Sequence, residues 1–311
     1  MADLQALDVS NGTNGVSHRH AIVLAGGEGK RLADVAHETY GYPRPKQFCQ
    51  FGSDRSLLEE TLERAERFTQ DRARIAVSLT RSQRAETDEC LRGWPEVLRV
   101  EQPSQAGTTP AIVLPLLHVL ERDPEATVLV LPSDHHISDD EVFVHALVDA
   151  CRVLDEHPDV VLLAGMHLAA PEPGLGWIVP GADQGGWRPI NRFVEKPTDA
   201  SAAALCASGA LANTFVILAR ASSLANLCWM YAPMWWVELG CSVGDQDALA
   251  RLYARERQSG FSHDVLAKAE GSLGVVPIEG VVWSDIGTPE RLFAMRRTPA
   301  ASGPPKRSQV V

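Results

Sequence analysis

The sequence lacks the features that mark secreted, membrane-spanning and nucleic-acid-binding proteins. Its six cysteines stand apart with no C-x-x-C pair, which favours reduced core thiols over a zinc site or a disulfide framework. No apolar run is long enough to span a bilayer, and the first residues have neither the basic nor the apolar stretch of a secretion signal. The formal net charge of -11 disfavours a general nucleic-acid surface. We therefore expect a cytoplasmic protein with no nucleic-acid and no membrane partner.

The bulk composition predicts a large globular core. The chain has 311 residues, 45% of them hydrophobic, which is enough for one large α/β domain or two modest ones. Polar, glycine-bearing and proline-bearing segments at the two ends are typical of disordered tails. We assign residues 1–18 to an N-terminal tail, 19–297 to a single domain and 298–311 to a C-terminal tail.

Strand-like and helix-like segments alternate along the domain. Apolar runs predict strands at residues 21–25, 75–79, 97–100, 127–131, 160–164, 213–219 and 274–277. Helical patterns fall at residues 56–68, 109–121 and 138–154, and Ser138 with Glu141 has the spacing of a capping box. This alternation predicts an α/β fold in which helices cover both faces of a mostly parallel, mixed sheet. Ligands of such sheets lie beyond the carboxyl ends of the strands.

A glycine loop, Gly26, Gly27 and Gly29, follows the first predicted strand directly, with Lys30 and Arg31 behind it. It matches neither a P-loop, which needs Gly-Lys-Ser/Thr, nor the G-x-G-x-x-G dinucleotide fingerprint. Glycines let successive N–H groups point inward as an anion-binding nest, and the two cations could close over a triphosphate. The alternative is a strand-ending turn with a solvated lysine and arginine.

Carboxylates stand at two further strand ends. Asp134 follows the strand at 127–131, and Asp285 lies in the loop Trp283-Ser284-Asp285-Ile286-Gly287. Mg²⁺ prefers one or two carboxylates together with substrate phosphates, so both are candidate ligands. Asp134 could instead cap a turn, and Asp285 could instead accept backbone N–H bonds. His135 and His136 suggest zinc, but adjacent side chains usually point apart and no third ligand has a recognisable spacing.

Two short motifs carry candidate phosphate-binding lysines. Glu195 and Lys196 end an extended stretch, where the turning backbone could aim a hydroxyl-binding carboxylate and a phosphate-binding ammonium at one ligand. The alternative for this dipeptide is a solvated surface pair. Lys46 follows two prolines that stiffen its loop, which fixes it more firmly than an ordinary loop lysine.

Eight motifs in order resemble the signatures of the sugar-1-phosphate nucleotidyltransferases, most closely the mannose-1-phosphate guanylyltransferase branch. The motifs are GGEGKRL, PRPKQF, EQPSQAGTTPAI, PSDHHI, GLGWIVPG, FVEKP, NTFVI and WSDIGTPERL. Together they cover the chain from about residue 21 to residue 297. The resemblance implies a Rossmann-like three-layer sandwich of the nucleotide-diphospho-sugar transferase type. It also implies the reaction of GTP with mannose 1-phosphate to give GDP-mannose and pyrophosphate.

The resemblance also implies a role for each matched position. It implies catalytic roles for Arg31, Lys46, Asp134 and Lys196. It implies nucleotide binding by Leu24, Ala25, Gly26, Gly27, Gly29, Lys30, Glu101, Gly107 and Thr108. It implies sugar-phosphate binding by Gly176, Glu195, Lys196 and Asn213, and Mg²⁺ binding by Asp134 and Asp285.

The sequence departs from the family pattern at four places and leaves other functions open. Lys30 replaces Thr or Ser, Trp177 replaces Tyr, Asn213-Thr214-Phe215 replaces Asn-Ser-Gly, and 105–108 replaces an Arg-Asn-Thr segment. These changes lie at the expected nucleotide and sugar positions. The alternatives are a pyrophosphorylase for another base or sugar, a nucleotide-sugar-dependent glycosyltransferase and a catalytically silent nucleotide-sugar sensor. A homodimer is also left open.

Overall fold

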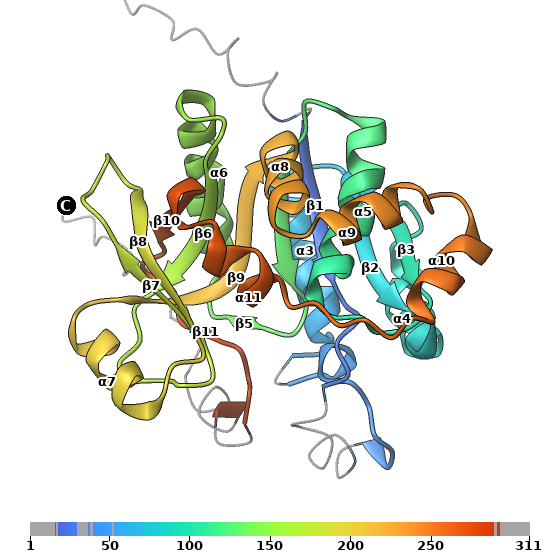
Figure 1. Cartoon of the computed structure of the whole chain (residues 1–311). Coiled ribbons are helices and arrows are strands. Elements are labelled where there is room, and N and C mark those ends of the chain that lie inside the picture. Colours follow the sequence, from blue (N-terminus) through green and yellow to red (C-terminus); the bar gives the residue numbers. More distant parts are fainter. Residues whose placement is uncertain are drawn as a thin grey trace, which may run out of the picture.

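A nine-stranded mixed sheet forms the centre of the molecule in a computed structural model (Figure 1). The structure describes residues 16, 18–29, 37, 40–51, 53–288 and 291–292. In sheet order the strands are β3 (Leu98–Gln102), β2 (Ile75–Thr80), β1 (Arg19–Leu24), β4 (Thr127–Pro132), β9 (Leu211–Arg220), β6 (Val161–Met166), β10 (Leu273–Pro277), β8 (Arg188–Glu195) and β7 (Gly176–Pro180).

The direction of the strands divides the sheet into two parts. β1 runs parallel to both β2 and β4, β2 runs parallel to β3, and β6 runs parallel to β10. β9 runs antiparallel to β4, β6 and β7, and β8 runs antiparallel to β10 and β7. The carboxyl ends of β1, β4 and β3 therefore meet the start of β9 at one edge of the sheet. This edge is where the α/β pattern predicts a ligand.

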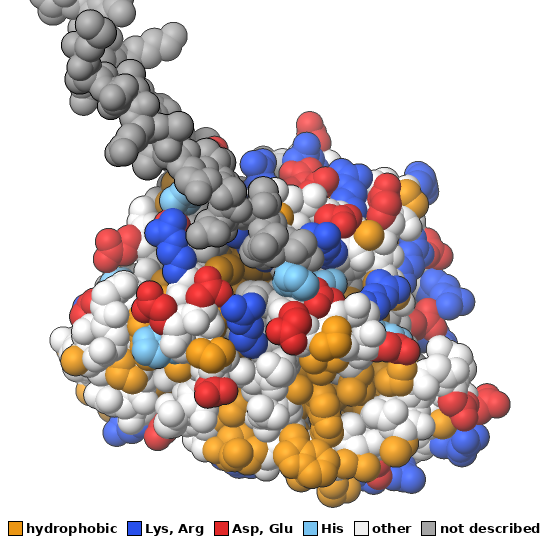
Figure 2. Space-filling view, turned by 90° about the horizontal axis from the view of Figure 1, so that it is seen from above, with side chains coloured by type: hydrophobic (Ala, Val, Ile, Leu, Met, Phe, Trp, Pro, Cys, Tyr) orange, Lys and Arg blue, Asp and Glu red, His pale blue; other side chains and the backbone are white. Residues whose placement is uncertain are grey.

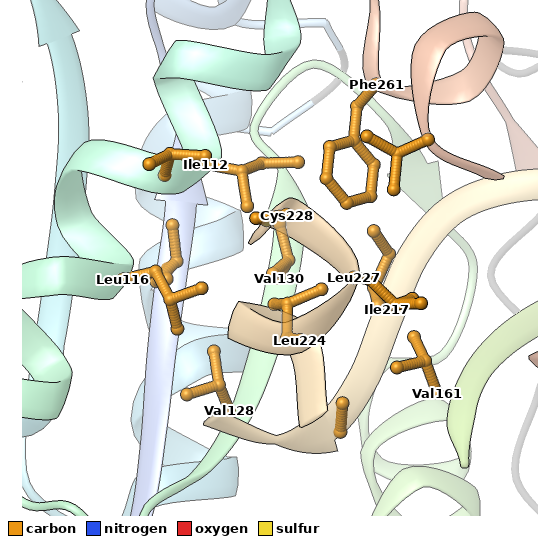
Figure 3. Close-up of a cluster of buried hydrophobic side chains, with 14 of the residues drawn as sticks. Ile112, Leu116, Val128, Val130, Val161, Ile217, Leu224, Leu227, Cys228 and Phe261 are labelled. Carbon is orange, nitrogen blue, oxygen red and sulfur yellow. The ribbon is translucent and has the colours of Figure 1, made fainter. Parts of the chain in front are cut away.

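Hydrophobic side chains fill both faces of the sheet. Ile22, Val128 and Val130 pack in one cluster, whereas their neighbours Val23 and Leu129 pack in the other. Such alternation within a continuous apolar run shows that these strands are buried on both sides. Figure 3 shows the first cluster, in which side chains from β4, β6 and β9 meet those of helices on one face.

Helices cover each cluster. On the face that Figure 3 shows in part they are α5 (Thr108–Arg122), α8 (Ala221–Tyr231), α9 (Pro233–Gly240), α10 (Gln246–Tyr253) and α11 (Phe261–Asp264). On the other face they are α3 (Leu57–Thr69) and α6 (Asp140–Glu156). The remaining α-helices of the described residues are α4 (Arg84–Cys90), whose Cys90 belongs to the second cluster, and α7 (Asp199–Ala207). The α/β fold predicted from the sequence is confirmed.

The predicted elements are present, with shifts at their ends. All seven predicted strands and all three predicted helices have counterparts within a few residues. The capping box predicted at Ser138 and Glu141 is wrong: Asp139 caps α6 by accepting from Val142 N at 3.0 Å. Ser138 Oγ instead accepts from Val282 N at 2.8 Å. The serine therefore joins two loops rather than starting the helix.

A small second sheet brings two distant loops together. β5 (His136–Ile137) pairs antiparallel with β11 (Trp283–Ser284), with His136 opposite Ser284. Asp285 follows β11 directly, and Asp134 lies two residues before β5. The pairing therefore holds both aspartates at the same edge of the main sheet.

The surface carries mixed charge and some exposed apolar side chains. Figure 2 shows hydrophobic side chains gathered along one edge of the upper face, with cationic and anionic side chains interspersed elsewhere. Trp229, Met230, Met234 and Val237 on α8 and α9 are among the large hydrophobics that are exposed. Across the described ranges, none of the helices combines the length and apolar character needed to cross a membrane.

A buried ion pair that joins α3 to α6 gives a prediction about stability. Arg64 is 2% exposed and its Nε donates to Asp140 Oδ1 at 2.6 Å. We expect Asp140→Ala to lower the free energy of unfolding by about 3 kcal/mol, because the buried Arg64 guanidinium would lose its carboxylate partner. Arg64→Met should cost less, since water can solvate the partly exposed aspartate. Urea unfolding of both variants measures the difference, and an equal or reversed order would contradict this account.

Candidate functional site

A cavity of about 250 Å³ opens where β1, β4 and β3 end and β9 begins. It lies at the edge of the sheet that the strand order selects as a ligand site. Its lining comes from the glycine loop, the loop after β3, the loop after β4 and the bend in β9. The lining residues are Leu24, Gly26, Gly27, Gln47, Gln102, Gln105, Gly107, Thr108, Ala111, Pro132, Ser133, Asp134, His135 and Phe215.

Side-chain amides hold the carbonyl groups of the glycine loop. Gln47 Nε2 donates to Ala25 O at 2.9 Å and to Gly27 O at 2.7 Å. Gln83 Nε2 also donates to Gly27 O, at 2.8 Å. Both glutamines are buried, so their amides fix the peptide planes of this loop. Ala25, a predicted nucleotide-binding residue, therefore contributes a buried carbonyl rather than cavity surface.

The next carbonyl is held in the same way. Gly26 O accepts from Thr80 Oγ1 at 3.1 Å and from Gln105 Nε2 at 2.8 Å. A trans peptide directs its C=O and the following N–H to opposite sides. Fixing the carbonyls of Ala25 and Gly26 therefore directs the N–H groups of Gly26 and Gly27 away from these amides. Because Gln47 holds the carbonyls of Ala25 and Gly27 while Thr80 and Gln105 hold that of Gly26, successive carbonyls alternate in direction, and the anion-binding nest stays a prediction.

Gly29 fits against the backbone of Lys46. It has a φ of +62°, and a Cβ at this position would lie 2.5 Å from Lys46 N. Only glycine allows both the left-handed backbone and this approach. Lys46 begins a 3-10 helix (η3, Lys46–Phe48) after Pro45 and is 6% exposed. The glycine loop thus sets the position of the lysine as well as its own N–H groups.

The Lys46 ammonium lies between the two predicted metal ligands. Its Nζ lies 2.9 Å from Asp134 Oδ2 and also donates to the backbone carbonyl of Asp285. Burial acts to raise the pKa of Asp134, but the charge of Lys46 outweighs it and holds that pKa below its usual value. Asp134 is therefore ionised at neutral pH. An ammonium has three donors, so Lys46 keeps one beyond these two contacts.

Asp285 uses its side chain differently from Asp134. Its Oδ1 accepts from Gly287 N at 3.1 Å and from the guanidinium of Arg291, which also pairs with Glu172. The loop-bracing alternative considered for this residue is thus what the structure contains. Among the described residues no three His, Cys, Asp or Glu side chains converge as a metal cage. Two carboxylates at one edge fit a Mg²⁺ that substrate phosphates help to hold, and do not fit a closed zinc site.

His135 packs between Trp283 and Asp134. The two rings meet edge to face with centroids 5.3 Å apart, and Trp283 Nε1 donates to His135 Nδ1 at 3.3 Å. An indole N–H only donates, so Nδ1 accepts and the ring proton lies on Nε2. That nitrogen lies 3.5 Å from Asp134 Oδ1. Burial lowers the pKa of His135, so the ring is neutral and orients the aspartate.

The loop after β3 forms the far end of the cavity. Gly107 has a φ of +93°, and a Cβ there would lie 2.2 Å from Ser259 O, so only glycine fits. Gln102 lines the cavity, where its Oε1 accepts from Tyr253 Oη at 2.9 Å and its Nε2 donates to Ser78 Oγ at 3.1 Å. Burial raises the pKa of Tyr253, so its hydroxyl stays protonated and able to donate. This end of the cavity presents a fixed amide.

Glu101 does not reach this cavity. Its carboxylate pairs with Arg81 at 2.9 Å and with Arg84 at 2.7 Å, and it lines a separate hollow beside these arginines. Successive strand residues face opposite ways, so Gln102, one residue on, takes the position that Glu101 is predicted to hold. The EQPSQAGTTPAI motif identified the loop that lines the cavity, but Gln102 rather than Glu101 faces the cavity from the end of β3.

The predicted sugar-binding residues come together beside the cavity. Gly176 on β7 pairs with Glu195 on β8, and a Cβ on Gly176 would lie 2.8 Å from Glu195 Oε2 and 3.4 Å from Asn213 Cβ. Burial raises the pKa of Glu195 above its usual value. Lys196 Nζ lies 3.8 Å from Glu195 Oε1, and its side chain is 70% exposed. Lys196 is thus close to a carboxylate and able to move.

Two predicted residues cannot be placed, and several others were missed. Lys30 and Arg31 lie outside the described residues, as do most of the two predicted tails. Gln47, Gln105 and Phe215 line the cavity without having been predicted to do so. Gln47 could have been found, because it follows Lys46 in the proline-stiffened motif. Gln105 and Phe215 stand in two of the segments that depart from the family pattern, so the sequence marked their segments without giving either residue a role.

Comparisons with known proteins agree with this geometry. The family model described as "Nucleotidyl transferase" matches residues 20–301. The Xanthan biosynthesis protein XanB of Xanthomonas campestris pv. campestris (strain B100) is 31% identical over 278 residues, 86% of this chain and 57% of that protein. The Mannose-1-phosphate guanylyltransferase 2 of Escherichia coli O157:H7 is 28% identical over 88% of this chain and 59% of that protein. The chain thus spans less than two thirds of these relatives.

Solved structures show the same fold. A structure titled mannose-1-phosphate geranyltransferase from Thermus thermophilus has a TM-score of 0.77 and 28% identity, covering 89% of this chain and 79% of that one. A UDP-glucose pyrophosphorylase complexed with UDP-glucose has a TM-score of 0.56 at 15% identity, covering 89% of this chain and 97% of that one, which shows likeness of fold. The predicted fold type is confirmed.

The contact between Lys46 and Asp134 gives a prediction about pH. We expect Lys46→Met to raise the pKa of Asp134, because the variant removes the positive charge that lowers that pKa. In the wild type the ionised aspartate stabilises the fold above its usual pKa of 3.8, and this stability is lost as pH falls through the lower folded pKa. NMR titration of labelled aspartate carboxyls measures the shift. Lys268→Met, on an exposed lysine, is the control, and an unmoved Asp134 pKa in Lys46→Met would contradict this assignment.

Proposed function

The chain belongs to the nucleotidyl transferase family, and from this membership we propose that it joins a nucleoside triphosphate to a sugar 1-phosphate. The products are a nucleoside diphosphate sugar and pyrophosphate. One observation carries the proposal: a buried ammonium contacts Asp134, which lines the glycine-loop cavity, and the backbone carbonyl of Asp285. Two polyanions can meet only where positive groups offset their repulsion.

The proposed reaction is an in-line displacement at the α-phosphorus. A phosphate oxygen of the sugar 1-phosphate attacks that phosphorus, the bond to the bridging oxygen breaks, and pyrophosphate leaves on the opposite side. No protein nucleophile is needed, because positioning and charge neutralisation supply most of the rate. Lys46 would neutralise the reacting phosphates, and the N–H groups of Gly26 and Gly27 would hold the triphosphate.

The sugar phosphate would bind beside Glu195. Its hydroxyls would contact Glu195 and Asn213, which the β7 and β8 pairing brings close to Gly176. Lys196 would hold its phosphate, since an exposed ammonium can swing to an anion that enters beside it. The alternative of a purely solvated Glu-Lys pair is disfavoured, because Glu195 is partly buried in this group.

Mg²⁺ is the proposed cofactor, held by Asp134 and Asp285. When bound it would supply positive charge to the phosphates. Asp134 is held ionised by Lys46, which suits a hard cation. Asp285 would have to share its carboxylate with Arg291.

GTP and mannose 1-phosphate are the proposed substrates. The sequence motifs that resemble the guanylyltransferase branch support this choice, as does the name of the relative from E. coli. The fixed amide of Gln102 and the amide of Gln105 would face the base. Both differ from the Arg-Asn-Thr pattern of that branch, so the choice of base is the part of the proposal most open to test.

We also propose a cytoplasmic homodimer. The buried Cys49, Cys90 and Cys228 are free thiols, and burial raises the pKa of Cys228 to about 12, which keeps it unreactive. Exposed Trp229 and Met230 on α8 would be covered by a second copy. Light scattering of the purified protein, with Trp229→Gln as the variant, tests the dimer.

A matrix of nucleoside triphosphates against sugar 1-phosphates tests the function. We expect the pair GTP and mannose 1-phosphate to release the most pyrophosphate, and only with Mg²⁺ present. A preference for another triphosphate or another sugar 1-phosphate would change the proposed base or sugar but leave the proposed reaction in place. Sugar transfer from GDP-mannose would favour a glycosyltransferase, and tight GDP-mannose binding without turnover would favour a sensor.

Removing the central cation or its carboxylate tests the mechanism. We expect Lys46→Ala and Asp134→Ala to fold but to lose about 100-fold or more in turnover, the usual cost of one preorganised charged group. Arg84→Ala is the matched control, because that arginine is exposed and lines the separate hollow. Pyrophosphate release at the wild-type rate by either site variant would refute the role given to that residue.

A further inference from the structure

A bulge in β9 points a phenylalanine into the cavity. Leu163 of β6 lies opposite Ile217, and Gly165 lies opposite Asn213, so β9 takes four steps where β6 takes two. Phe215 stands in the middle of this bulge with a φ of +60°. A bulky side chain in the left-handed region is an outlier that persists only where its surroundings impose it.

Neighbouring side chains impose this conformation. Phe215 N donates to Asn213 Oδ1 at 3.1 Å, and Val216 N donates to Thr214 Oγ1 at 3.2 Å. Thr214 Oγ1 also donates to Ala164 O of β6 at 2.8 Å. These bonds replace the ladder contacts that the bulge removes. The structure therefore holds Phe215 in a strained backbone at the wall of a cavity, where strain is commonly functional.

A second aromatic ring, that of Phe261, packs against Phe215. Phe215 and Phe261 meet edge to face with centroids 6.4 Å apart. Figure 3 shows Phe261 at the upper end of the buried cluster, close to the start of its short helix α11. Phe261 N donates to Thr108 Oγ1 at 2.8 Å, which ties it to the far end of the cavity. The Phe215 ring is thus packed on a fixed neighbour.

The segments that carry Phe215 and Phe261 contact both the glycine-loop cavity and the group of predicted sugar-binding residues. Phe215 lines the same cavity as Gly26 and Asp134. Two residues earlier on the same strand, Asn213 lies beside Gly176 in the group that also contains Glu195. The Ser262 side chain, next to Phe261, hydrogen-bonds Glu195. Segments that carry the two phenylalanines therefore touch both the nucleotide side and the sugar side.

We propose that Phe215 determines which sugar 1-phosphate the protein accepts. This inference rests on the proposed function. The ring forms the wall between nucleotide and sugar, where it presents an apolar surface to the hexose and fills space that a substituent on the sugar would need. An aromatic face packs well on pyranose C–H groups and offers no partner to an amide. Unsubstituted hexose 1-phosphates are therefore accepted, and 2-acetamido-2-deoxyhexose 1-phosphates are rejected.

Kinetics with substituted sugars test the proposal. The ratio of kcat/KM for mannose 1-phosphate to that for N-acetylglucosamine 1-phosphate should fall about tenfold or more in Phe215→Gly, a usual effect of opening a pocket. Phe215→Leu should give a smaller fall, and the KM for the nucleoside triphosphate should change less than about twofold. A ratio that stays constant or rises in Phe215→Gly, or a triphosphate KM that moves as much as the sugar KM, would overturn the proposal.

Thermal unfolding tests the strained conformation separately. Phe215→Gly and Phe215→Ala both remove the ring, but only glycine adopts positive φ freely, so Phe215→Gly should have the higher Tm by a few degrees. Gln70→Gly is the matched control: Gln70 also has a positive φ, of 56°, but caps α3 far along the chain and should leave the sugar ratio unchanged. A Tm for Phe215→Ala equal to or above that of Phe215→Gly would contradict the claim that the surroundings hold residue 215 at a positive φ.

These experiments distinguish a failure of the proposed function from a failure of the inference about Phe215. If the wild type releases no pyrophosphate with any pair of substrates, the proposed function fails and the sugar assignment falls with it. If the wild type is active but the Phe215 variants keep its sugar ratio, only the inference about Phe215 fails.

Discussion

The contact of one lysine with two loops organises the site. Lys46 Nζ binds the Asp134 carboxylate and the Asp285 carbonyl, groups that lie far from it in sequence. The Asp134 carboxylate loses hydration at this edge of the sheet and would favour protonation if no cation lay nearby, whereas the Asp285 carboxylate pairs with Arg291. A buried ammonium between the two loops removes this penalty and keeps Asp134 ionised. The same arrangement gives a phosphate a positive group that is already positioned.

The position of Lys46 depends in turn on backbone packing. Gly29 approaches the Lys46 backbone more closely than any side chain would allow, and Gln47 holds the carbonyls of the same loop. The loop and the lysine are therefore one rigid unit, so a ligand that binds the loop N–H groups meets the ammonium without further ordering. Preorganisation of this kind lowers the entropy cost of binding and stabilises charge where it develops.

The sequence predicted the parts of the fold and site that local chemistry determines. Buried strands such as β1 and β4 were found because both faces are apolar, whereas β7 was missed and β8 was anticipated only at its end, because their sequences mix polar residues, glycine and proline. Lys46 and Asp134 follow rigid or apolar segments, so their direction could be anticipated. Glu101 and Gln102 are both polar at the end of β3, so no local pattern shows which one faces the cavity. The bulge at Phe215 depends on pairing with β6 and has no local signal.

Net charge and local charge act in opposite directions in this protein. A formal charge of -11 would repel the proposed polyanionic substrates at long range, and this repulsion would weaken with salt beyond about 10 Å. Attraction must therefore come from contact: oriented N–H groups in the glycine loop and the buried Lys46 ammonium. Such groups are screened little by salt because water and ions are excluded from them. If the proposed function holds, recognition by contact would let the site separate one sugar phosphate from another, because each substituent would meet the fixed wall of the cavity.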